Sequence, residues 1–497
     1  MTTAASKPAW NILFILMDDL GWHDTGPYGN AFIDTPNLDR FATESARFTN
    51  AYAACPVCSP TRASILTGKY PARLHLTDWI PGRKQWPYAK LLTPSFNQEL
   101  PLGETTIAEA LHPAGYKAAA IGKWHLGGTG YLPTDQGFDI NIGGTAAGSP
   151  PTYFGPLTLP GLKLEPGEFL TQRLTLEGSR FIRENPSRPF FLYESHFTVH
   201  MPLQAPDELV DKYRKRNTAD VDPIYCAMVE TADLSVGRLL KALDDSGKAK
   251  NTIVVFFSDN GGVRYQSRRP RPVTNNSPLR AGKGHVYEGG IREPLMIRWP
   301  GTTRAGSVIN DPISSVDLAP TLCEAAGARL GKVDGVSIRP LLRSGHLTER
   351  PLFWHYPHYS DQGGKPAGAV RLGEWKLIEF YEDSRLELFH LADDPGERRK
   401  SRSPGTCASE EVTRAIGRLA NIGECVDAKA KSKLRSRSCE RRVDRLRTPN
   451  SARIADGARV YEREPCLKGY DAISLRPDWE RQLEQPTEQR PIHSSGA

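Results

Sequence analysis

The sequence contains no long apolar run, and this bounds how the protein can relate to a membrane. Among its 497 residues no stretch approaches the roughly 18 apolar residues that a membrane-spanning helix needs, so we expect no membrane span. The apolar run at residues 12–17 is too short for a signal-peptide core, and Asp18-Asp19 follow it in place of small cleavage-site residues. We expect a cytoplasmic protein as the sequence stands. Residues 2–8 resemble the segment after a cleavage site, and a start further upstream would make the protein periplasmic or secreted.

Cysteine is also sparse, and positive charge is unevenly spread. Eight cysteines are too few to form a disulfide scaffold in a chain of this length, and four of them lie in the last hundred residues. Residues 398–497 carry 22 Lys and Arg against 14 Asp and Glu, whereas the remainder carries 42 against 43. The net charge of +7 therefore belongs to a basic tail that we interpret as a solvated segment, and we expect no nucleic-acid partner.

Short apolar runs alternate with helical patterns over most of the chain. Alternating strands and helices predict a large, mostly parallel sheet sandwiched by helices, an α/β fold. Thr35-Pro36 is typical of a helix start, and we expect that helix to continue to Arg47. The predicted strands are residues 11–17, 116–121, 189–194, 252–258 and 294–299, and the other predicted helices are residues 222–245 and 316–326.

The pattern changes after about residue 340. Residues 375–381 and 385–391 flank the turn at residues 382–384 and are predicted to form an antiparallel hairpin. Beyond Glu397 apolar periodicity stops, and poor order is the expectation. We therefore predict a large domain at residues 1–340, a small C-terminal α+β subdomain at 341–397 and a poorly ordered basic tail at 398–497.

Metal-binding residue types follow two of the predicted strands. Asp18 and Asp19 come after the first strand, and Asp259 with Asn260 follows the strand at residues 252–258. Ligands bind outside the carboxyl ends of strands in open α/β sheets. Carboxylate and amide oxygens suit hard cations such as calcium or magnesium. Either pair alone would be explained by the start of a turn, but the two together predict a metal site.

The most informative segment is residues 58–68, CSPTRASILTG. Pro60 indicates the first turn of a helix with Cys58 at its N-terminus, where free amides and the helix dipole favour an anionic group. Cys58 could simply be a buried packing residue. With Cys55 it could form a CxxC redox pair. The third interpretation is a Cys-x-Pro-x-Arg signature followed by Leu-Thr-Gly, a pattern far rarer by chance than CxxC.

By this motif the chain resembles the type I, formylglycine-dependent sulfatases, the arylsulfatase A-like members of the alkaline phosphatase superfamily. The resemblance extends from about residue 11 to residue 397, with every expected motif in order. It implies an alkaline phosphatase-like fold with residues 1–340 as the catalytic domain. It also implies that a formylglycine-generating maturation enzyme converts Cys58 to 3-oxoalanine. The hydrated aldehyde would then offer one hydroxyl to attack sulfur and a second to expel the sulfate.

The resemblance further implies a ligand set and catalytic roles. One metal ion, usually calcium and less readily magnesium, would be bound by Asp18, Asp19, Cys58, Asp259 and Asn260. Arg62 would hold the aldehyde hydrate and neutralise charge beside the metal.

The implied catalytic groups lie in three further blocks. Within GKWHLG at residues 122–127, Lys123 would contact the sulfate and His125 would take a proton from the second hydroxyl. Of the two histidines in residues 191–206, only His200 is followed by x-Pro. We assign it as the general acid, a role worth about 10²–10⁴ in rate, and expect His196 to be structural. Lys283 would hold a sulfate oxygen.

The sequence therefore predicts a sulfuric ester hydrolase that acts on a carbohydrate or aryl sulfate. The closest alternative is a phosphonate monoester or phosphodiester hydrolase of the same superfamily; a non-catalytic binding protein on this fold and a CxxC oxidoreductase are the others. The leaving group is poorly defined by sequence. Candidate substrate-binding residues are Arg264, in the arginine-rich segment 262–276, and His355, in residues 355–364. We hypothesise that the arginines recognise further anionic groups on a sulfated sugar.

Overall fold

The computed structural model describes residues 10–185, 188–216, 220–264 and 272–399. The tail predicted at residues 398–497 lies outside the described residues from residue 400 onward, and so do residues 265–271 of the arginine-rich segment. Across the described ranges no helix is both long and apolar enough to cross a membrane.

The apolar run near the N-terminus forms β1 (Asn11–Met17), a strand with both faces buried. Leu13, Ile15 and Met17 pack into one hydrophobic cluster. Their neighbours Ile12, Phe14 and Leu16 pack into another on the opposite face. Side chains of a strand alternate between the two faces of the sheet, so a strand with helices on both sides needs a continuous apolar run. This explains why the sequence at residues 11–17 shows no alternation.

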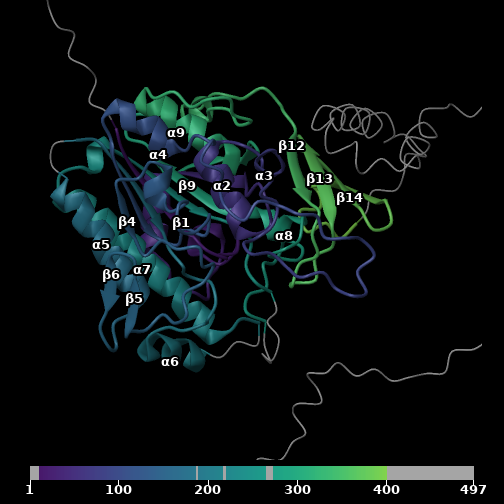
Figure 1. Cartoon of the computed structure of the whole chain (residues 1–497), viewed down its shortest axis with the longest axis horizontal. Helices are drawn as coiled ribbons and strands as arrows, with labels where there is room; N and C mark the ends of the chain where they lie inside the picture. Colours follow the sequence, from purple (N-terminus) through teal and green to yellow (C-terminus); the bar gives the residue numbers. More distant parts are fainter. Residues whose placement is uncertain (1–9, 186–187, 217–219, 265–271, 400–497) are drawn as a thin grey trace, which may run out of the picture. The chain divides into compact units, whose positions relative to one another are not determined.

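In the described part of the chain, nine strands form the main sheet, with β1 near its middle (Figure 1). The order is β10-β2-β9-β8-β1-β7-β3-β4, with β11 paired to β2. Most neighbours are parallel, but β9 runs antiparallel to both β2 and β8. The predicted mostly parallel α/β sheet is thus confirmed, with one antiparallel strand inserted. Its strands are β1, β2 (Ala46–Tyr52), β3 (Lys117–Gly122), β4 (Ile140–Ile142), β7 (Phe190–Ser195), β8 (Thr252–Ser258), β9 (Arg292–Arg298), β10 (Ser307–Ile309) and β11 (Ile313–Ser314).

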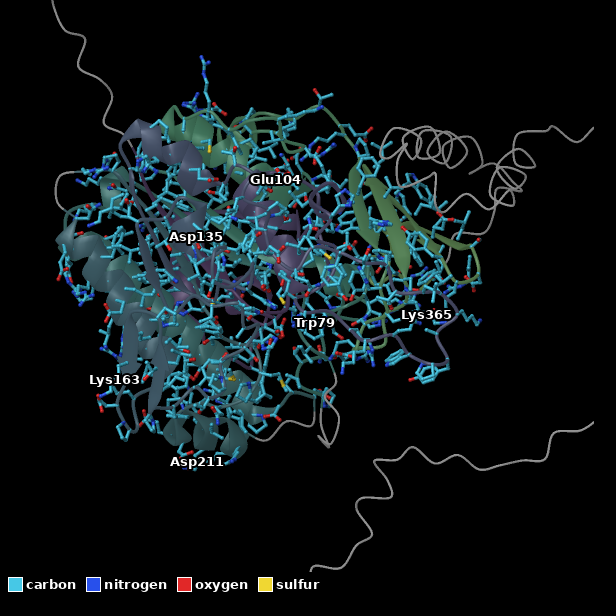
Figure 2. All side chains as sticks on the ribbon, in the orientation of Figure 1. Trp79, Glu104, Asp135, Lys163, Asp211 and Lys365 are labelled. Atoms are coloured by element: carbon cyan, nitrogen blue, oxygen red, sulfur yellow. The ribbon has the colours of Figure 1, made fainter. Side chains whose placement is uncertain are left out.

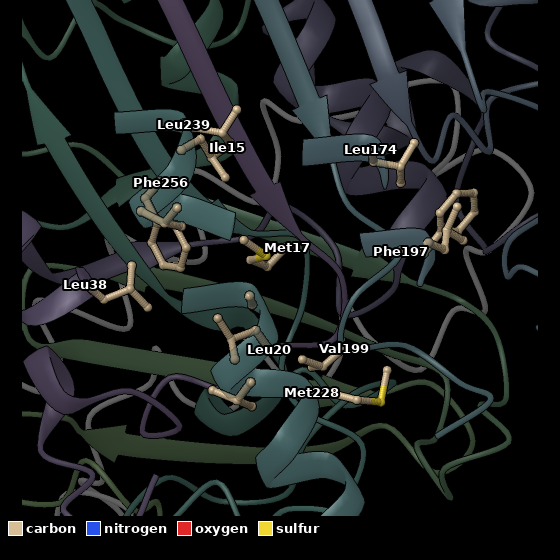
Figure 3. Close-up of a cluster of buried hydrophobic side chains, with 14 of the residues drawn as sticks. Ile15, Met17, Leu20, Leu38, Leu174, Phe197, Val199, Met228, Leu239 and Phe256 are labelled. Atoms are coloured by element: carbon tan, nitrogen blue, oxygen red, sulfur yellow. The ribbon is translucent and has the colours of Figure 1, made fainter. Parts of the chain in front are cut away.

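Helices cover both faces of this sheet. Side chains of α1, α5 and α7 join the cluster that contains Ile15 and Met17, part of which is drawn in Figure 3. Side chains of α2, α4 and α9 join the cluster on the opposite face. The helices are α1 (Pro36–Glu44), α2 (Cys58–Thr67), α3 (Pro71–Leu74), α4 (Ile107–Leu111), α5 (Leu170–Glu184), α6 (Asp207–Arg216), α7 (Pro223–Asp245), α8 (Glu288–Ile291), α9 (Leu318–Ala326) and α10 (Arg339–Leu342).

One predicted helix is too long. The helix that begins after Thr35 ends at Glu44 and does not reach Arg47, because Ser45 is extended at φ −118° and ψ 166°. The chain continues directly into β2, which pairs with β9 on one side and β10 on the other. These partners lie about 250 residues away in the sequence, so a local pattern gives no sign of the strand.

The predicted hairpin is confirmed as part of a separate antiparallel sheet. β14 (Trp375–Phe380) pairs with β15 (Arg385–His390) across the predicted turn. β12 (Leu352–Tyr356) and β13 (Ala367–Leu372) complete the sheet in the order β12-β13-β14-β15. A two-stranded hairpin, β5 (Leu157–Leu159) with β6 (Leu162–Leu164), is also present in the described part of the chain.

A buried ionic network joins the antiparallel sheet to the main body. Lys376 of β14, with no exposed side-chain area, lies 2.9 Å from Glu288 Oε1 and 3.0 Å from Glu397 Oε1. Glu397 in turn accepts a 2.6 Å hydrogen bond from the Glu288 amide, and its carbonyl accepts one from Arg280 Nη1 at 2.9 Å. Burial raises the pKa of Glu397 to about 7, although Lys376 opposes the shift. The network therefore fixes both ends of the segment between Arg280 and Glu288.

We expect Lys376→Met to be strongly destabilising. The change leaves two buried carboxylates without their shared cation, and breaking a buried ion pair in this way costs about 3–5 kcal/mol. Urea denaturation at pH 7 measures the free energy of unfolding. Lys163→Met, which removes an exposed 2.8 Å pair with Glu165, is the control and should leave stability almost unchanged. Equal effects of the two substitutions would contradict this account.

Candidate active site

The acidic residues predicted to bind metal meet at one edge of the main sheet. β1 and β8 are parallel neighbours whose last residues, Met17 and Ser258, are paired, so the residues that follow them leave the sheet side by side. Asp259 Oδ1 accepts a hydrogen bond from the Asp19 amide at 3.2 Å. Asn260 Nδ2 donates to Asp19 Oδ1 at 2.8 Å. All of these side chains are essentially inaccessible to solvent.

Arg62 is the cation at the base of this acidic edge. It lies in the first turns of α2, is fully buried, and donates through Nε to Asp259 Oδ2 at 2.8 Å. Its Nη2 lies 2.7 Å from the same oxygen and 3.8 Å from Asp18 Oδ2. Its Nη1 reaches Ser195 Oγ at 2.5 Å. The neighbouring carboxylates outweigh burial and keep the pKa of Arg62 above its ordinary value. A guanidinium suits this role because its donors form a fixed planar fork.

Two lysines complete the arrangement from separate parts of the chain. Lys123, which directly follows β3, places Nζ 2.5 Å from Asp18 Oδ2. Lys283, which lies in the segment ahead of α8, places Nζ 2.6 Å from Asp19 Oδ1. Burial would raise the pKa of Asp19, but Lys283 and His200 lower it to about 2. We call the whole set the charge cluster; it contains Asp18, Asp19, Asp259, Arg62, Lys123 and Lys283.

The charge cluster has features that fit a divalent cation. Counted as ionised, its three carboxylates balance its three cations, so a divalent ion would leave the charge cluster with two positive charges, which suits an anionic substrate. Asp18 Oδ1 and Asn260 Oδ1 are buried oxygens without a hydrogen-bond partner among the described residues, which is costly unless a cation meets them. Burial together with Asp259 raises the pKa of Asp18 to about 8. Atoms of Asp18, Asp19 and His200 also lie within 4.8 Å of one another, a spacing that could hold a metal ion.

Of the predicted metal ligands, Asp19, Asp259 and Cys58 have other partners in this structure. Both oxygens of Asp19 are met by Lys283 Nζ. Both oxygens of Asp259 are engaged, one by Arg62 and one by the Asp19 amide. The Cys58 thiol faces His125, with Sγ 3.3 Å from Nδ1. The residues whose oxygens remain open toward a cation are therefore Asp18 and Asn260.

Cys58 and His125 are hydrogen-bond partners, and the contacts of His125 show which of its ring nitrogens carries the proton. Cys58 is the first residue of α2, as its sequence predicts, and is buried. His125 Nε2 lies 2.5 Å from the Ile80 carbonyl, which can only accept, so Nε2 carries the proton. Nδ1 is then the basic nitrogen, and it faces Cys58. Burial and Lys123 hold the pKa of His125 well below its ordinary value, which keeps the ring neutral.

The two histidines after β7 occupy different environments. His200 Nδ1 donates to the Met201 carbonyl at 2.9 Å, which turns Nε2 toward Asp19 Oδ2 at 3.6 Å. Burial and Lys283 lower the pKa of His200 to about 3. His196 is fully buried, with Nε2 2.8 Å from Ser235 Oγ between the sheet and α7. His200 therefore borders the charge cluster, whereas His196 faces the protein core.

Comparison with known proteins identifies the family. A family model described as Sulfatase matches residues 10–328, and one described as N-sulphoglucosamine sulphohydrolase, C-terminal, matches residues 281–415. N-acetylgalactosamine-6-sulfatase of Rattus norvegicus is 32% identical over 481 residues, with 85% of this chain and 86% of that protein covered. Arylsulfatase A of Homo sapiens is 32% identical over 485 residues, with 86% and 89% covered. The chain belongs to the sulfatase family.

Solved structures agree with this assignment. The structure of Ps i-CgsB in complex with k-i-k-neocarrahexaose has a TM-score of 0.68 and 29% identity, and covers 79% of this chain and 88% of that one. The phosphonate monoester hydrolase of Agrobacterium radiobacter, the alternative class, has a TM-score of 0.59 at 19% identity with 85% and 96% covered, and shares the fold alone. The predictions of an alkaline phosphatase-like fold and of a sulfuric ester hydrolase are confirmed.

The two predicted substrate-binding residues lie outside the charge cluster. Arg264 lines a cavity of about 470 Å³ together with Arg280 and Arg398. His355 lies on β12 with Nδ1 2.8 Å from the Tyr381 hydroxyl. Side chains alternate along β12, so His355 points away from the face that carries Trp354 and Tyr356. Those two side chains point into the body of the sulfatase. The contacts of His355 therefore give no support for a substrate-binding role, which stays a prediction.

Sequence analysis missed Ser195, whose hydroxyl lies between Arg62 and the Lys123 carbonyl. Ser195 Oγ donates to that carbonyl at 2.8 Å and accepts from Arg62. It ends β7, which is the parallel neighbour of β1. Only its position in the sequence indicates a role for Ser195. The last residue of a third central parallel strand must reach the same edge of the sheet as Asp18 and Asp259.

We expect His200→Ala and His196→Asn to separate catalysis from stability. If His200 is the predicted proton donor to the leaving alcohol, His200→Ala should lower kcat on a sulfated monosaccharide, whose alkoxide is a poor leaving group, by about 10²–10⁴-fold. His196→Asn should lower the unfolding temperature and leave kcat per folded molecule within a few-fold of the parent. Steady-state kinetics and thermal unfolding measure both effects. The role of His200 would be refuted by a variant that folds normally and keeps its full rate.

Proposed function

We propose that this sulfatase hydrolyses a sulfate monoester of a carbohydrate through a formylglycine residue made from Cys58, with calcium held in the charge cluster. The observation that carries the proposal is the placement of three buried carboxylates, two buried cations and the partly buried Lys283 around a cysteine at the start of a helix. A buried group of this composition is expensive unless it serves chemistry, because each charge must be stripped of water. Perturbed, coupled ionisable groups are typical of active sites.

The site suits a nucleophile made from Cys58. Burial raises the pKa of the Cys58 thiol, so the unmodified residue is a poor thiolate nucleophile. Its conversion to formylglycine would supply a geminal diol, with one hydroxyl to attack sulfur and one whose loss of a proton releases sulfate. His125 Nδ1, the unprotonated nitrogen that faces Cys58, is placed to take that proton. Arg62 supports this position from within the same helix.

A cation would be held by hard oxygen donors. Asp18 and Asn260 provide open oxygens, and Asp19 and Asp259 lie beside them. Calcium accepts six to eight oxygen ligands in variable geometry, which suits a mixed carboxylate and amide set better than the strict octahedron of magnesium. When bound, such an ion supplies positive charge for the sulfate and lowers the pKa of a hydroxyl near it.

The lysines and His200 would act on the sulfate ester itself. Lys123 and Lys283 hold their ammonium groups against Asp18 and Asp19, so positive charge is already in place before the substrate arrives. Bound sulfate ester would add negative charge near His200 and so favour its protonation. His200, oriented through its Nδ1 hydrogen bond to Met201, would then donate a proton to the leaving oxygen.

A carbohydrate leaving group is supported by the relatives. N-acetylgalactosamine-6-sulfatase is named for a sulfated sugar, and Ps i-CgsB was solved with a carrageenan-type hexasaccharide. A sulfated small molecule remains compatible with the similarity to arylsulfatase A.

Cys58 and Cys55 provide a matched pair of tests. Cys58→Ala should abolish hydrolysis of 4-nitrophenyl sulfate by protein produced together with a formylglycine-generating enzyme, because no aldehyde can form. Cys55→Ser should keep the activity within a few-fold, since the Cys55 thiol is buried with its sulfur near the Thr77 carbonyl. Inorganic sulfate release is the readout. A dithiol mechanism would instead lose activity in both variants.

Calcium binding is testable without turnover. Addition of Ca²⁺ to chelator-treated protein should raise its unfolding temperature, because an ion at about 100 times its Kd adds about 2.7 kcal/mol of stability. Asn260→Ala should weaken this response, whereas Asn260→Asp, which keeps an oxygen at the site, should retain it. Mg²⁺ should stabilise less than Ca²⁺. An unfolding temperature that does not respond to either ion would contradict the proposed metal site.

A further inference from the structure

A group of aromatic side chains around the loop after α3 has no part in the chemistry described above. Its centre is Trp86, in the loop at residues 81–96, whose ring lies 5.3 Å from Tyr88 in a stacked arrangement and 6.0 Å from Tyr359. The guanidinium of Arg83 lies 3.2 Å from the Trp86 ring centroid. We call Arg83, Trp86, Tyr88 and Tyr359 the aromatic platform.

The platform is ordered by its own contacts, with Tyr359 buried and Trp86 partly exposed. The Tyr359 hydroxyl accepts from the Lys90 and Leu91 amides at 3.1 and 3.3 Å and donates to Glu382 at 2.8 Å. Arg83 pairs with Asp361. Tyr88 is nevertheless 76% exposed and Leu92, on the same loop, is 86% exposed. Large apolar side chains gathered on a surface indicate a binding site.

The two segments that carry the platform each contact residues that border the active site. The loop begins after Ile80, whose carbonyl accepts from His125 and whose amide donates to Ser59 Oγ, beside Cys58. On the other side, the turn after Tyr359 packs against Gly284, where a Cβ would come within 1.8 Å of Ser360 Oγ. Gly284 directly follows Lys283. The segments that carry the platform therefore begin beside Cys58 and beside Lys283, on two sides of the position proposed for the sulfate.

Figures 1 and 2 show where the loop that carries Trp86 lies. In Figure 1 the purple-to-blue segment that follows α3 runs beneath the sheet formed by β12, β13 and β14. In Figure 2 Trp79 is labelled at the base of this loop, and Lys365 is labelled to its right, in the segment that follows Tyr359.

We propose that the aromatic platform binds the sugar rings next to the one that loses its sulfate, so that the substrate is an oligosaccharide or polysaccharide. Flat aromatic faces match the C–H faces of pyranose rings, and Trp and Tyr offer a large contact area at low entropic cost. Exposed Lys84 and Lys90 flank the rings and suit further sulfate groups on a polyanionic chain. This inference rests on the proposed function, because it takes a saccharide sulfate as substrate.

The test compares a platform variant with a matched tryptophan variant. The platform variant is Trp86→Ala with Tyr88→Ala. The control is Trp375→Ala, which removes a partly buried tryptophan at the far end of β14 from Tyr381 and Glu382. Its ring centroid lies 4.6 Å from that of His390 in a tilted arrangement. The probes are 4-nitrophenyl sulfate and three sulfated hexasaccharides, derived from carrageenan, chondroitin 6-sulfate and heparan sulfate. Hydrolysis is followed by sulfate release, and binding by calorimetry in a Cys58→Ala background.

For each hexasaccharide that the parent hydrolyses, kcat/KM is divided by kcat/KM for 4-nitrophenyl sulfate. The platform variant should lower this ratio by about tenfold, mainly through a higher KM for the hexasaccharide. Its calorimetric Kd should rise by a similar factor, Trp86→Phe should restore most of the loss, and the control should keep the parent ratio. The proposal is overturned by an unchanged ratio, by a failure of all three hexasaccharides to bind, or by a change of oligomeric state in the platform variant. If the hexasaccharides bind but the parent protein releases sulfate from none of the probes, the result would support the platform and refute the proposed function.

Discussion

The structure of the site depends on the burial of Arg62 between two carboxylates at the ends of neighbouring strands. A fully buried guanidinium is stable only if its charge is paired, and here Asp259 pairs with Nε and Nη2 while Ser195 and the Lys123 carbonyl accept from Nη1. All three partners lie at the same edge of the sheet: Asp259 follows β8, Ser195 ends β7 and Lys123 follows β3. Because Arg62 lies one turn into α2, the same contacts fix where that helix begins and therefore where Cys58 lies.

The remaining charges follow from this arrangement. Pairing Asp259 with Arg62 leaves Asp18 and Asp19 to be neutralised, and the chain supplies Lys123 and Lys283 from segments 160 residues apart. The segment that carries Lys283 is in turn held by Glu397 and Lys376 of the C-terminal region. The antiparallel sheet thus contributes to the site indirectly, by positioning a cation. It also contributes Tyr359, which links its surface to the loop after Ile80.

Much of this could be predicted from the sequence because the signals are local. The buried strands β1 and β8 are continuous apolar runs, and the residues at their ends carry the metal-type side chains. β2 cannot be predicted from a local pattern because its partners are distant in sequence, and the predicted helix before it is therefore too long. Residue type alone favours His355 as a substrate contact, while Tyr359 and Trp86 belong to no motif. Their proximity arises from a loop that folds against a turn some 270 residues away.

The central claim is that the encoded cysteine at position 58 is a precursor of the nucleophile. Mass spectrometry of the tryptic peptide that contains Cys58, from active protein produced with a formylglycine-generating enzyme, tests this most directly. Conversion of –CH₂SH to –CHO predicts a peptide about 18 Da lighter than the thiol form, in proportion to the specific activity. An active preparation whose Cys58 peptide has only the unmodified thiol mass would contradict the account.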